Sequence, residues 1–293
     1  MHISTIVGVF DTNEKTVITM HTPSHLHTAM DFVHSAAFSR GEINPVLLKE
    51  LRKHIYHDQI VAVNIALVKE RIAESVTMDN HIVQAINAIE EITKSANTLI
   101  KRVREWYGYY FPELEHHIED NEIFVRRILQ KSKEEFMQEL SLTVSMGPSL
   151  ATREVEMIFG FAREVGDLFT ARQKLVAYLE EVMGEYCPNL LAVTGVLIGA
   201  KLFEKAGSLR KLSLLPSSTI QLLGAEKALF RHLRNKRIKP PKHGFILSHP
   251  FLMESKDKGK AARILSAKIS IAVKVDYFKG EFIGDKLKEK LHM

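Results

Sequence analysis

Residues 150–185 carry the pattern that most restricts the fold of this 293-residue chain. Apolar side chains recur in this segment at spacings of three, four or seven, which places them on one side of an α-helix. These are Val155, Phe159, Ala162, Val165, Phe169, Val176, Leu179 and Met183. The other sides of that helix are densely charged. Such a narrow seam is typical of a coiled coil. Residues 118–144 show a second helical pattern before the turn at 146–149, so we predict an antiparallel hairpin of these two segments.

A single hairpin of this kind buries little surface, so we expect two copies of the chain to pair. The dimer contacts are expected from the apolar seam, at Val155, Phe159, Val165, Phe169 and Val176. A lone hairpin is the alternative.

The first 80 residues differ in character. Ile3–Phe10 is a short β-branched run ended by Asp11, which indicates a strand, and residues 16–20 suit its hairpin partner. Helical patterns follow at 28–38 and 45–57, whereas 58–75 is compatible with strand or helix. These features predict a small α/β N-terminal domain.

A helical pattern over 79–111 ends in an aromatic cluster. Its members are Trp106, Tyr107, Tyr109, Tyr110 and Phe111. Proline disfavours helix at the residue before it, so Pro112 predicts a corner. Packing in a core is the simplest interpretation of so many rings.

Charge is unevenly distributed along the chain. Residues 186–293 hold 21 lysines and arginines against 8 acidic residues, a net charge of +13. Residues 1–185 hold 19 against 27, a net charge of −8. This contrast predicts parts with different partners: phosphates for the helical C-terminal third and protein for the acidic part.

The strongest concentration of charge lies between Lys227 and Lys242, which span seven cations and no carboxylate. Lys227, Arg231 and Arg234 fall on one helical face, where like charges repel. A polyanion would neutralise them, and nucleic acid is the leading candidate. A merely solvated basic face is the alternative. We expect this helix to continue to Pro240 and a final helix, about 258–279, to carry Lys258, Lys260, Arg263, Lys268 and Lys274.

Signals of an enzyme are missing from the sequence. It has no Gly-x-Gly-x-x-Gly, P-loop or Gly-x-Ser-x-Gly motif, and its close histidines lack the spacing of a known metal site. A single cysteine, Cys187, fits a reducing compartment. No apolar run reaches the ~18–20 residues that span a bilayer. We predict no catalytic residue, metal or cofactor, no membrane contact, and a cytoplasmic protein.

Several segments resemble the Nop family, core proteins of box C/D ribonucleoproteins. The resemblance to the Nop domain rests on Ala206–Leu209, Pro216–Gln221, Leu223–Arg231 and His249-Pro250. Further matches are the aromatic corner Trp106–Gly108 with Phe111–Leu114, the segment Cys187–Leu190, and the last helix, Ala261–Phe278. The resemblance covers roughly residues 100–280, and the first 80 residues match only in outline.

This resemblance implies a mainly α protein with three parts. Residues 1–115 would form the fibrillarin-binding α/β domain with a helical connector, 116–187 a self-dimerising coiled coil, and 188–293 an all-helical Nop domain. The Nop domain would bind a kink-turn in the box C/D guide RNA, already held by a ribosomal-protein-like subunit. The chain would position fibrillarin for ribose 2′-O-methylation of ribosomal or transfer RNA and perform no chemistry itself. The short chain is similar to the archaeal members.

The expected RNA-binding residues combine the basic segment with the motif before it. They are Gly224, Ala225, Glu226, Lys227, Arg231, Arg234, Lys236, Arg237, Lys239, Lys242 and His243. One departure lies at Ser213-Leu214-Leu215, where the family usually has a lysine, and Lys211 is a possible substitute. Two other functions remain open: a spliceosomal-type Nop-domain protein and a stand-alone RNA-modifying enzyme.

Overall fold

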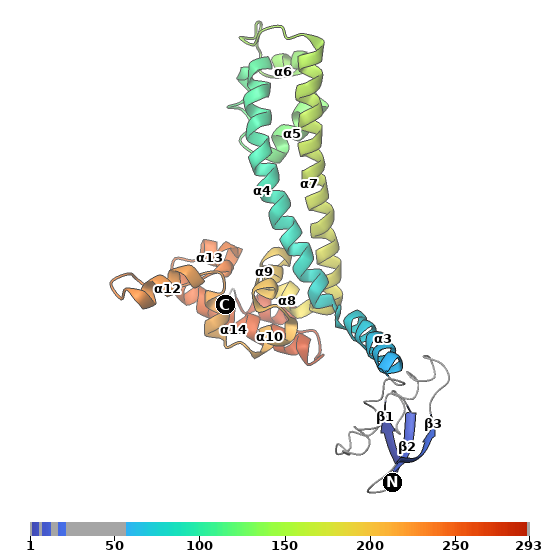
Figure 1. Cartoon of the computed structure of the whole chain (residues 1–293). Helices are drawn as coiled ribbons and strands as arrows, with labels where there is room; N and C mark the ends of the chain where they lie inside the picture. Colours follow the sequence, from blue (N-terminus) through green and yellow to red (C-terminus); the bar gives the residue numbers. More distant parts are fainter. Residues whose placement is uncertain (1, 6–7, 13–16, 22–56, 292–293) are drawn as a thin grey trace. The chain divides into compact units, whose positions relative to one another are not determined.

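The computed structural model describes residues 2–5, 8–12, 17–21 and 57–291. The chain divides into two compact units, Met1–Thr77 and Met78–Met293, and Figure 1 labels most of their elements. The described part of the first unit contains a small sheet and a helix, and that of the second contains helices as its only regular structure. The predicted mainly α class is confirmed.

The sheet of the first unit is antiparallel, in the order β1-β2-β3. Its strands are β1 (His2–Thr5), β2 (Gly8–Thr12) and β3 (Val17–His21). Phe10 pairs with Met20, as the predicted hairpin requires. The run Ile3–Phe10 is however two strands, because β2 starts at Gly8 and pairs back on β1. A glycine inside a strand pattern often marks such a break.

The open question over residues 58–75 is settled by α3 (His57–Ser75), which is a helix. The predicted helices 28–38 and 45–57 lie outside the described residues, apart from His57.

Two long antiparallel helices, α4 (Met78–Tyr110) and α7 (Thr152–Tyr186), dominate the second unit (Figure 1). The Tyr186 hydroxyl donates to Asp79 at one end (3.0 Å), and the Tyr107 and Phe159 rings meet near the other. Apolar side chains of both helices are buried along this seam, which confirms an antiparallel hairpin that contains residues 150–185.

The partner predicted for that hairpin was wrong. Residues 118–144 form two short helices, α5 (Asn121–Gln130) and α6 (Lys133–Glu139), and α4 supplies the long partner helix instead. The break is caused by Ser132, whose side chain accepts from the Glu135 N–H while the Glu135 carboxylate accepts from the Ser132 N–H. This reciprocal capping starts a new helix at once.

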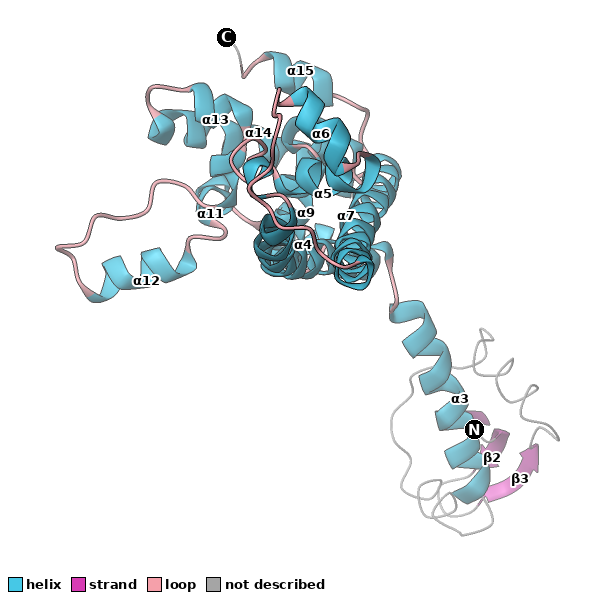
Figure 2. Cartoon of the chain, turned by 90° about the horizontal axis from the view of Figure 1, so that it is seen from above, coloured by secondary structure: helices cyan, strands magenta, loops and turns pink. Residues whose placement is uncertain are grey.

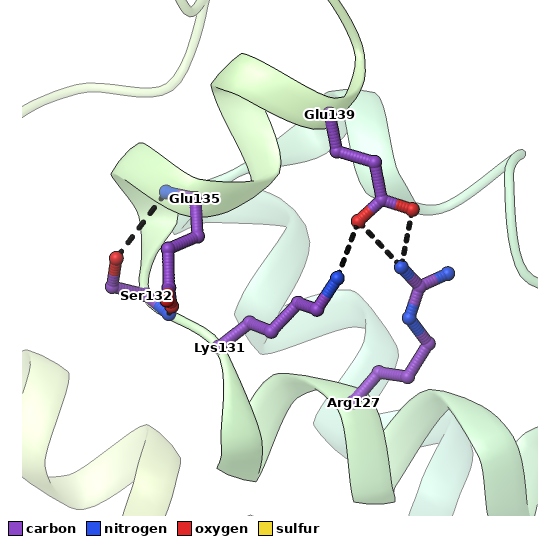
Figure 3. A network of polar contacts seen from close by, with 5 residues as sticks. All are labelled: Arg127, Lys131, Ser132, Glu135 and Glu139. Atoms are coloured by element: carbon purple, nitrogen blue, oxygen red, sulfur yellow. Dashed lines mark hydrogen bonds and ion pairs between the residues drawn. The ribbon is translucent and has the colours of Figure 1, made fainter.

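Ion pairs between side chains, as well as the cap at Ser132, hold the two short helices together (Figure 3). Arg127 donates to both oxygens of Glu139, and the Lys131 ammonium lies 2.8 Å from the same carboxylate. Hydrogen bonds from Lys131 and Arg127 lower the pKa of Glu139 to about 2. The α5–α6 corner is therefore charged at neutral pH.

The aromatic corner after α4 is mainly core, as predicted. Tyr107 and Phe111 are buried, Tyr107 packs edge-on against Phe124 (5.7 Å between centroids), and Pro112 begins a 3-10 turn, η2 (Pro112–Leu114). Trp106 and Tyr109 are the exceptions, because they are 37% and 67% exposed.

The C-terminal part is a cluster of shorter helices around α14 (Lys258–Tyr277). The others are α8 (Pro188–Thr194), α9 (Val196–Ala206), α10 (Leu209–Leu214), α11 (Ser217–Leu222), α12 (Glu226–Arg234), η3 (Phe245–Ser248), α13 (Pro250–Glu254) and α15 (Gly284–Glu289).

A buried carboxylate joins the start of this cluster to its end. Asp276 accepts hydrogen bonds from the Asn189 N–H (3.0 Å), the Asn189 side-chain amide (2.8 Å) and the Leu190 N–H (2.8 Å). Asn189 in turn accepts from the Ile283 N–H at 2.7 Å. The first N–H groups of a helix have no partner within it, so Asp276 caps α8 from 86 residues away.

Candidate nucleic-acid interface

The predicted RNA-binding residues come together on α12 and on the loop 235–244 that follows it. Seen from above, this helix and its loop project from the rest of the second unit (Figure 2), and no residue of α12 is buried. The helix ends at Arg234, six residues before the predicted end at Pro240. Asn235 ends it, because its side-chain oxygen accepts from the Arg237 N–H (3.1 Å) and so competes with the helix.

Two different stripes run along α12. Lys227, Arg231 and Arg234 are exposed and lie on one face, as their spacing predicts. Phe230 and Leu233 lie on the adjoining face, with 65% and 53% of their side chains exposed. The cations were found by sequence reasoning, but the apolar stripe was missed. A short helix that exposes this much apolar surface next to cations is suited to a partner with both phosphate and apolar groups.

The turn before α12 depends on two residues of the Gly224-Ala225-Glu226-Lys227 motif. Gly224 has φ +89°, and a Cβ there would meet the Phe245 ring at 2.7 Å. The Glu226 carboxylate accepts from the Gly224 N–H at 2.7 Å. Glu226 therefore holds the turn that presents Lys227.

The loop is held at its base by hydrogen bonds with Gln221 of α11. The Gln221 side chain donates to the Lys242 carbonyl (2.6 Å), and the Gly244 N–H donates to the Gln221 carbonyl (2.9 Å). A Cβ on Gly244 would lie 1.8 Å from the Leu223 carbonyl oxygen, so this close approach needs glycine. Half-buried His243 lies at this anchor, whereas Lys236, Arg237, Lys239 and Lys242 are exposed.

The cations of this surface have no ion-pair partner within the described part of the chain. No ion pair joins any of the seven cations from Lys227 to Lys242 to a described carboxylate. Such a concentration of positive charge attracts polyanions and raises their association rate.

The departure from the family pattern at residues 213–215 leaves an apolar side chain on the surface. Leu214 is 73% exposed, and Ser213 is buried with its hydroxyl donating to the Arg210 carbonyl (2.8 Å). Lys211, one turn earlier in α10, is exposed. Lys211 is the cation nearest in sequence to Leu214, where a lysine was expected.

The residues predicted to form the dimer contact lie in the chain's own hairpin. Val165 and Phe169 are buried there, and Phe159 packs against Tyr107 and Tyr110. Val155 and Val176 are half-buried. On α4, Leu99 (36%), Trp106 (37%) and Tyr109 (67%) are exposed apolar side chains that share one face.

The described residues offer little for metal or thiol chemistry. No group of three or more metal-ligating side chains gathers among them, and none of their helices has an apolar stretch able to cross a membrane. Burial raises the pKa of the Cys187 thiol, which keeps it protonated and poorly nucleophilic.

Comparison with known proteins agrees with the motifs. A family model described as "Nop: snoRNA binding domain, fibrillarin" matches residues 88–293. An uncharacterized NOP5 family protein of Methanocaldococcus jannaschii is 40% identical over 232 residues, 73% of this chain and 56% of that protein. Nucleolar protein 58 of Aspergillus fumigatus is 40% identical over 217 residues, 68% of this chain and 36% of that protein.

Nucleolar protein 56 of Homo sapiens is 38% identical over 239 residues, 73% of this chain and 40% of that protein. The chain thus spans between 36% and 56% of the length of these three relatives. A solved structure of a fibrillarin/Nop5p complex covers all of this chain and 97% of the matched chain, with a TM-score of 0.47 and 24% identity. The family assignment does not depend on that likeness.

The family model covers the α4–α7 hairpin from residue 88 onward and all the helices that follow α7, including α12. The resemblance inferred from the motifs is confirmed, and the protein belongs to the snoRNA-binding Nop family.

Proposed function

We propose that this protein is a non-catalytic scaffold of a box C/D guide ribonucleoprotein. In this proposal it binds a kink-turn RNA together with the ribosomal-protein-like subunit on that RNA. It also recruits fibrillarin for 2′-O-methylation of ribosomal or transfer RNA. The observation that carries the proposal is α12, a projecting helix without a buried residue, with a cationic stripe beside an apolar one.

The two stripes of α12 would contact different parts of the proposed RNA–protein partner. Lys227, Arg231 and Arg234 would contact RNA phosphates, whose neutralisation releases counterions and supplies sequence-independent affinity. Phe230 and Leu233 would contact the protein subunit, since exposed apolar patches beside polar groups are typical of protein interfaces. The loop cations Lys236, Arg237, Lys239 and Lys242, with His243, would extend the RNA contact. Gly224, Ala225 and Glu226 would form the turn that presents it.

Fibrillarin is the proposed partner of the N-terminal part. The family description names fibrillarin, and residues 1–185 carry a net charge of −8, which suits a basic protein and repels RNA. We propose residues 1–115 for this role and 188–293 for RNA, while self-association would involve 116–187 together with α4. The long hairpin nevertheless crosses the first boundary, because α4 is one of its two helices.

Self-association through the hairpin is the remaining element of the proposal. Val165 and Phe169 are already covered by the chain's own helices, so the exposed stripe Leu99, Trp106 and Tyr109 on α4 is the better candidate for the contact. Phe159, Val155 and Val176 would support the hairpin that presents it.

The salt dependence of RNA binding tests the assignment of α12. Lys227→Glu with Arg231→Glu should weaken binding to a kink-turn RNA carrying its protein subunit and reduce the slope of log K against log salt by roughly two, about 0.9 for each lost contact. Lys286→Glu with Lys288→Glu, which changes the charge of exposed α15 residues equally, is the matched control. An unchanged slope in the α12 variant would contradict the proposal.

A further inference from the structure

The last long helix has an exposed face that the proposed function leaves unused. Along α14 the exposed positions Arg263, Ala267, Ile271 and Lys274, followed by Phe278, recur every three or four residues. This spacing puts them on one side of the helix, opposite the buried core side. At 1.5 Å per residue the stripe from Arg263 to Phe278 is roughly 22 Å long.

The charge of this helix has one sign at the surface. It carries the cations Lys258, Lys260, Arg263, Lys268 and Lys274 and a single carboxylate, Asp276. That carboxylate is buried and is occupied by the N–H groups of α8. No ion pair joins the five cations to a described carboxylate, so the face resembles the α12 surface electrostatically.

The acidic groups at the start of the helix do not interrupt the stripe. Asp257 caps the helix and accepts from the Gly259 and Lys260 N–H groups at 3.0 and 3.1 Å. These hydrogen bonds, with the charges of Lys242 and Arg263, lower the pKa of Asp257. The exposed Glu254 lies before the helix, in α13.

The exposed stripe on α14 begins next to the end of the basic loop 235–244. A Cβ on Gly259, in the first turn of α14, would lie 3.3 Å from the Lys242 side chain, so this side chain at the end of loop 235–244 lies against that turn. Cations therefore follow one another from α12 through the loop to α14.

An exposed ring stands at the far end of the stripe. Phe278 is 74% exposed and packs edge-on against Tyr277 at 5.1 Å between centroids. Ile271, halfway along, is 43% exposed. Proteins that bind single-stranded nucleic acid commonly combine a cationic groove or stripe with an exposed aromatic ring. The nucleic-acid backbone follows the charges, and a base stacks on the ring.

We infer that the α14 face from Lys260 to Phe278 binds a single-stranded stretch of RNA. The phosphates lie along Lys260, Arg263 and Lys274, and an unstacked base lies on the Phe278 ring. This face is separate from α12, and the inference rests on the proposed function only for RNA as the class of partner. The strand held here would be the continuation of the RNA whose folded part contacts α12 and its loop.

The test measures anisotropy of a labelled oligouridylate on the full chain at several salt concentrations. Arg263→Glu with Lys274→Glu should reduce the magnitude of the salt slope by about 1.4, since each phosphate contact on a single strand contributes about 0.7. Phe278→Ala should weaken binding about 5- to 150-fold, the range for one stacked base, and leave the slope unchanged. Circular dichroism melting of each variant confirms that these surface changes leave the fold intact.

Controls distinguish this inference from the proposed function. Lys286→Glu with Lys288→Glu should leave oligouridylate binding within about twofold of wild type, because α15 lies outside the stripe. The α12 variant, Lys227→Glu with Arg231→Glu, tests the kink-turn complex independently of the oligouridylate result.

Three outcomes would overturn the inference. One is equal loss in the α14 and α15 variants, which indicates a general charge effect. Another is unchanged affinity in Phe278→Ala. The third is equal competition by a perfect RNA duplex or by polyglutamate, which shows that the face accepts any polyanion or an acidic protein.

Discussion

At the scale of single residues, Asp276 has the clearest structural role. It is 8% exposed and accepts three hydrogen bonds that would otherwise be missing inside the C-terminal cluster. Burial raises the pKa of Asp276, and the N–H donors of Leu190 and Asn189 oppose that shift.

Replacing this carboxylate should be costly. Asp276→Ala leaves three buried donors without a partner, and at about 1–3 kcal/mol each we expect a loss of at least about 3 kcal/mol in the free energy of unfolding. Denaturant unfolding of both proteins measures it. Ser270→Ala, in the same helix and also nearly buried, is the control and should cost much less. Equal stability of Asp276→Ala and wild type would show that the donors find other partners.

Glu139 is the residue with a predictable pH effect. Its pKa in the folded protein is about 2, below the ordinary 4.5. A depressed pKa means that the ionised carboxylate contributes to stability above about pH 4.5, and that this contribution is lost as the pH falls toward 2.

Glu139→Gln should therefore flatten the fall of the melting temperature between pH 4.5 and pH 2. The effect should be small and should shrink in high salt, because the Lys131 and Glu139 side chains are about 40% exposed (41% and 40%) and such pairs are screened. A variant with the wild-type pH profile at low salt would rule out this ion pair as a source of stability.

Single residues also show which features of the structure could be predicted from the sequence. Helical periodicity was enough to place Lys227, Arg231 and Arg234 on one face, because their positions depend only on residues within three turns. The contact between Asp276 and Asn189 was not predictable, because it joins segments that come together only in the folded core. The end of α12 was misplaced because Pro240 is a stronger sequence signal than the local turn at Asn235.

At the scale of elements, the hairpin shows the same difference between local and long-range information. The apolar seam of α7 was evident in the sequence, but both 79–111 and 118–144 offered it a helical partner. The pattern Ser132-x-x-Glu135 was a detectable sign that the second candidate is broken. The choice of α4 required knowledge of which long helix covers the seam.

The exposed stripe on α4 carries the prediction for self-association. Trp106→Glu with Tyr109→Glu places two charges on the stripe that we propose as the dimer contact, and should convert a dimer to a monomer in sedimentation or light scattering. Neither side chain is buried, so the variant should stay folded. Tyr178→Glu, an exposed position on α7, is the matched control.

A folded double variant with wild-type mass would exclude this stripe as the interface. Phe169→Glu is a poor substitute, because Phe169 is part of the hairpin core and a buried unpaired charge would unfold the chain.

At the scale of the whole molecule, the proposed scaffold separates binding from chemistry. The unit Met78–Met293 is compact by itself, with its own core around α14, so RNA binding should survive without residues 1–75. The acidic character of residues 1–185 suggested this division from sequence.

Methyl transfer from labelled S-adenosylmethionine in a reconstituted mixture tests the proposed scaffold function directly. The mixture contains a guide RNA, its target, the kink-turn-binding subunit and fibrillarin. We expect no transfer by this protein alone, guided transfer with all components, and loss of transfer but retained RNA binding when residues 1–75 are deleted. Transfer by the protein alone, or unchanged transfer in its absence, would contradict the proposed function.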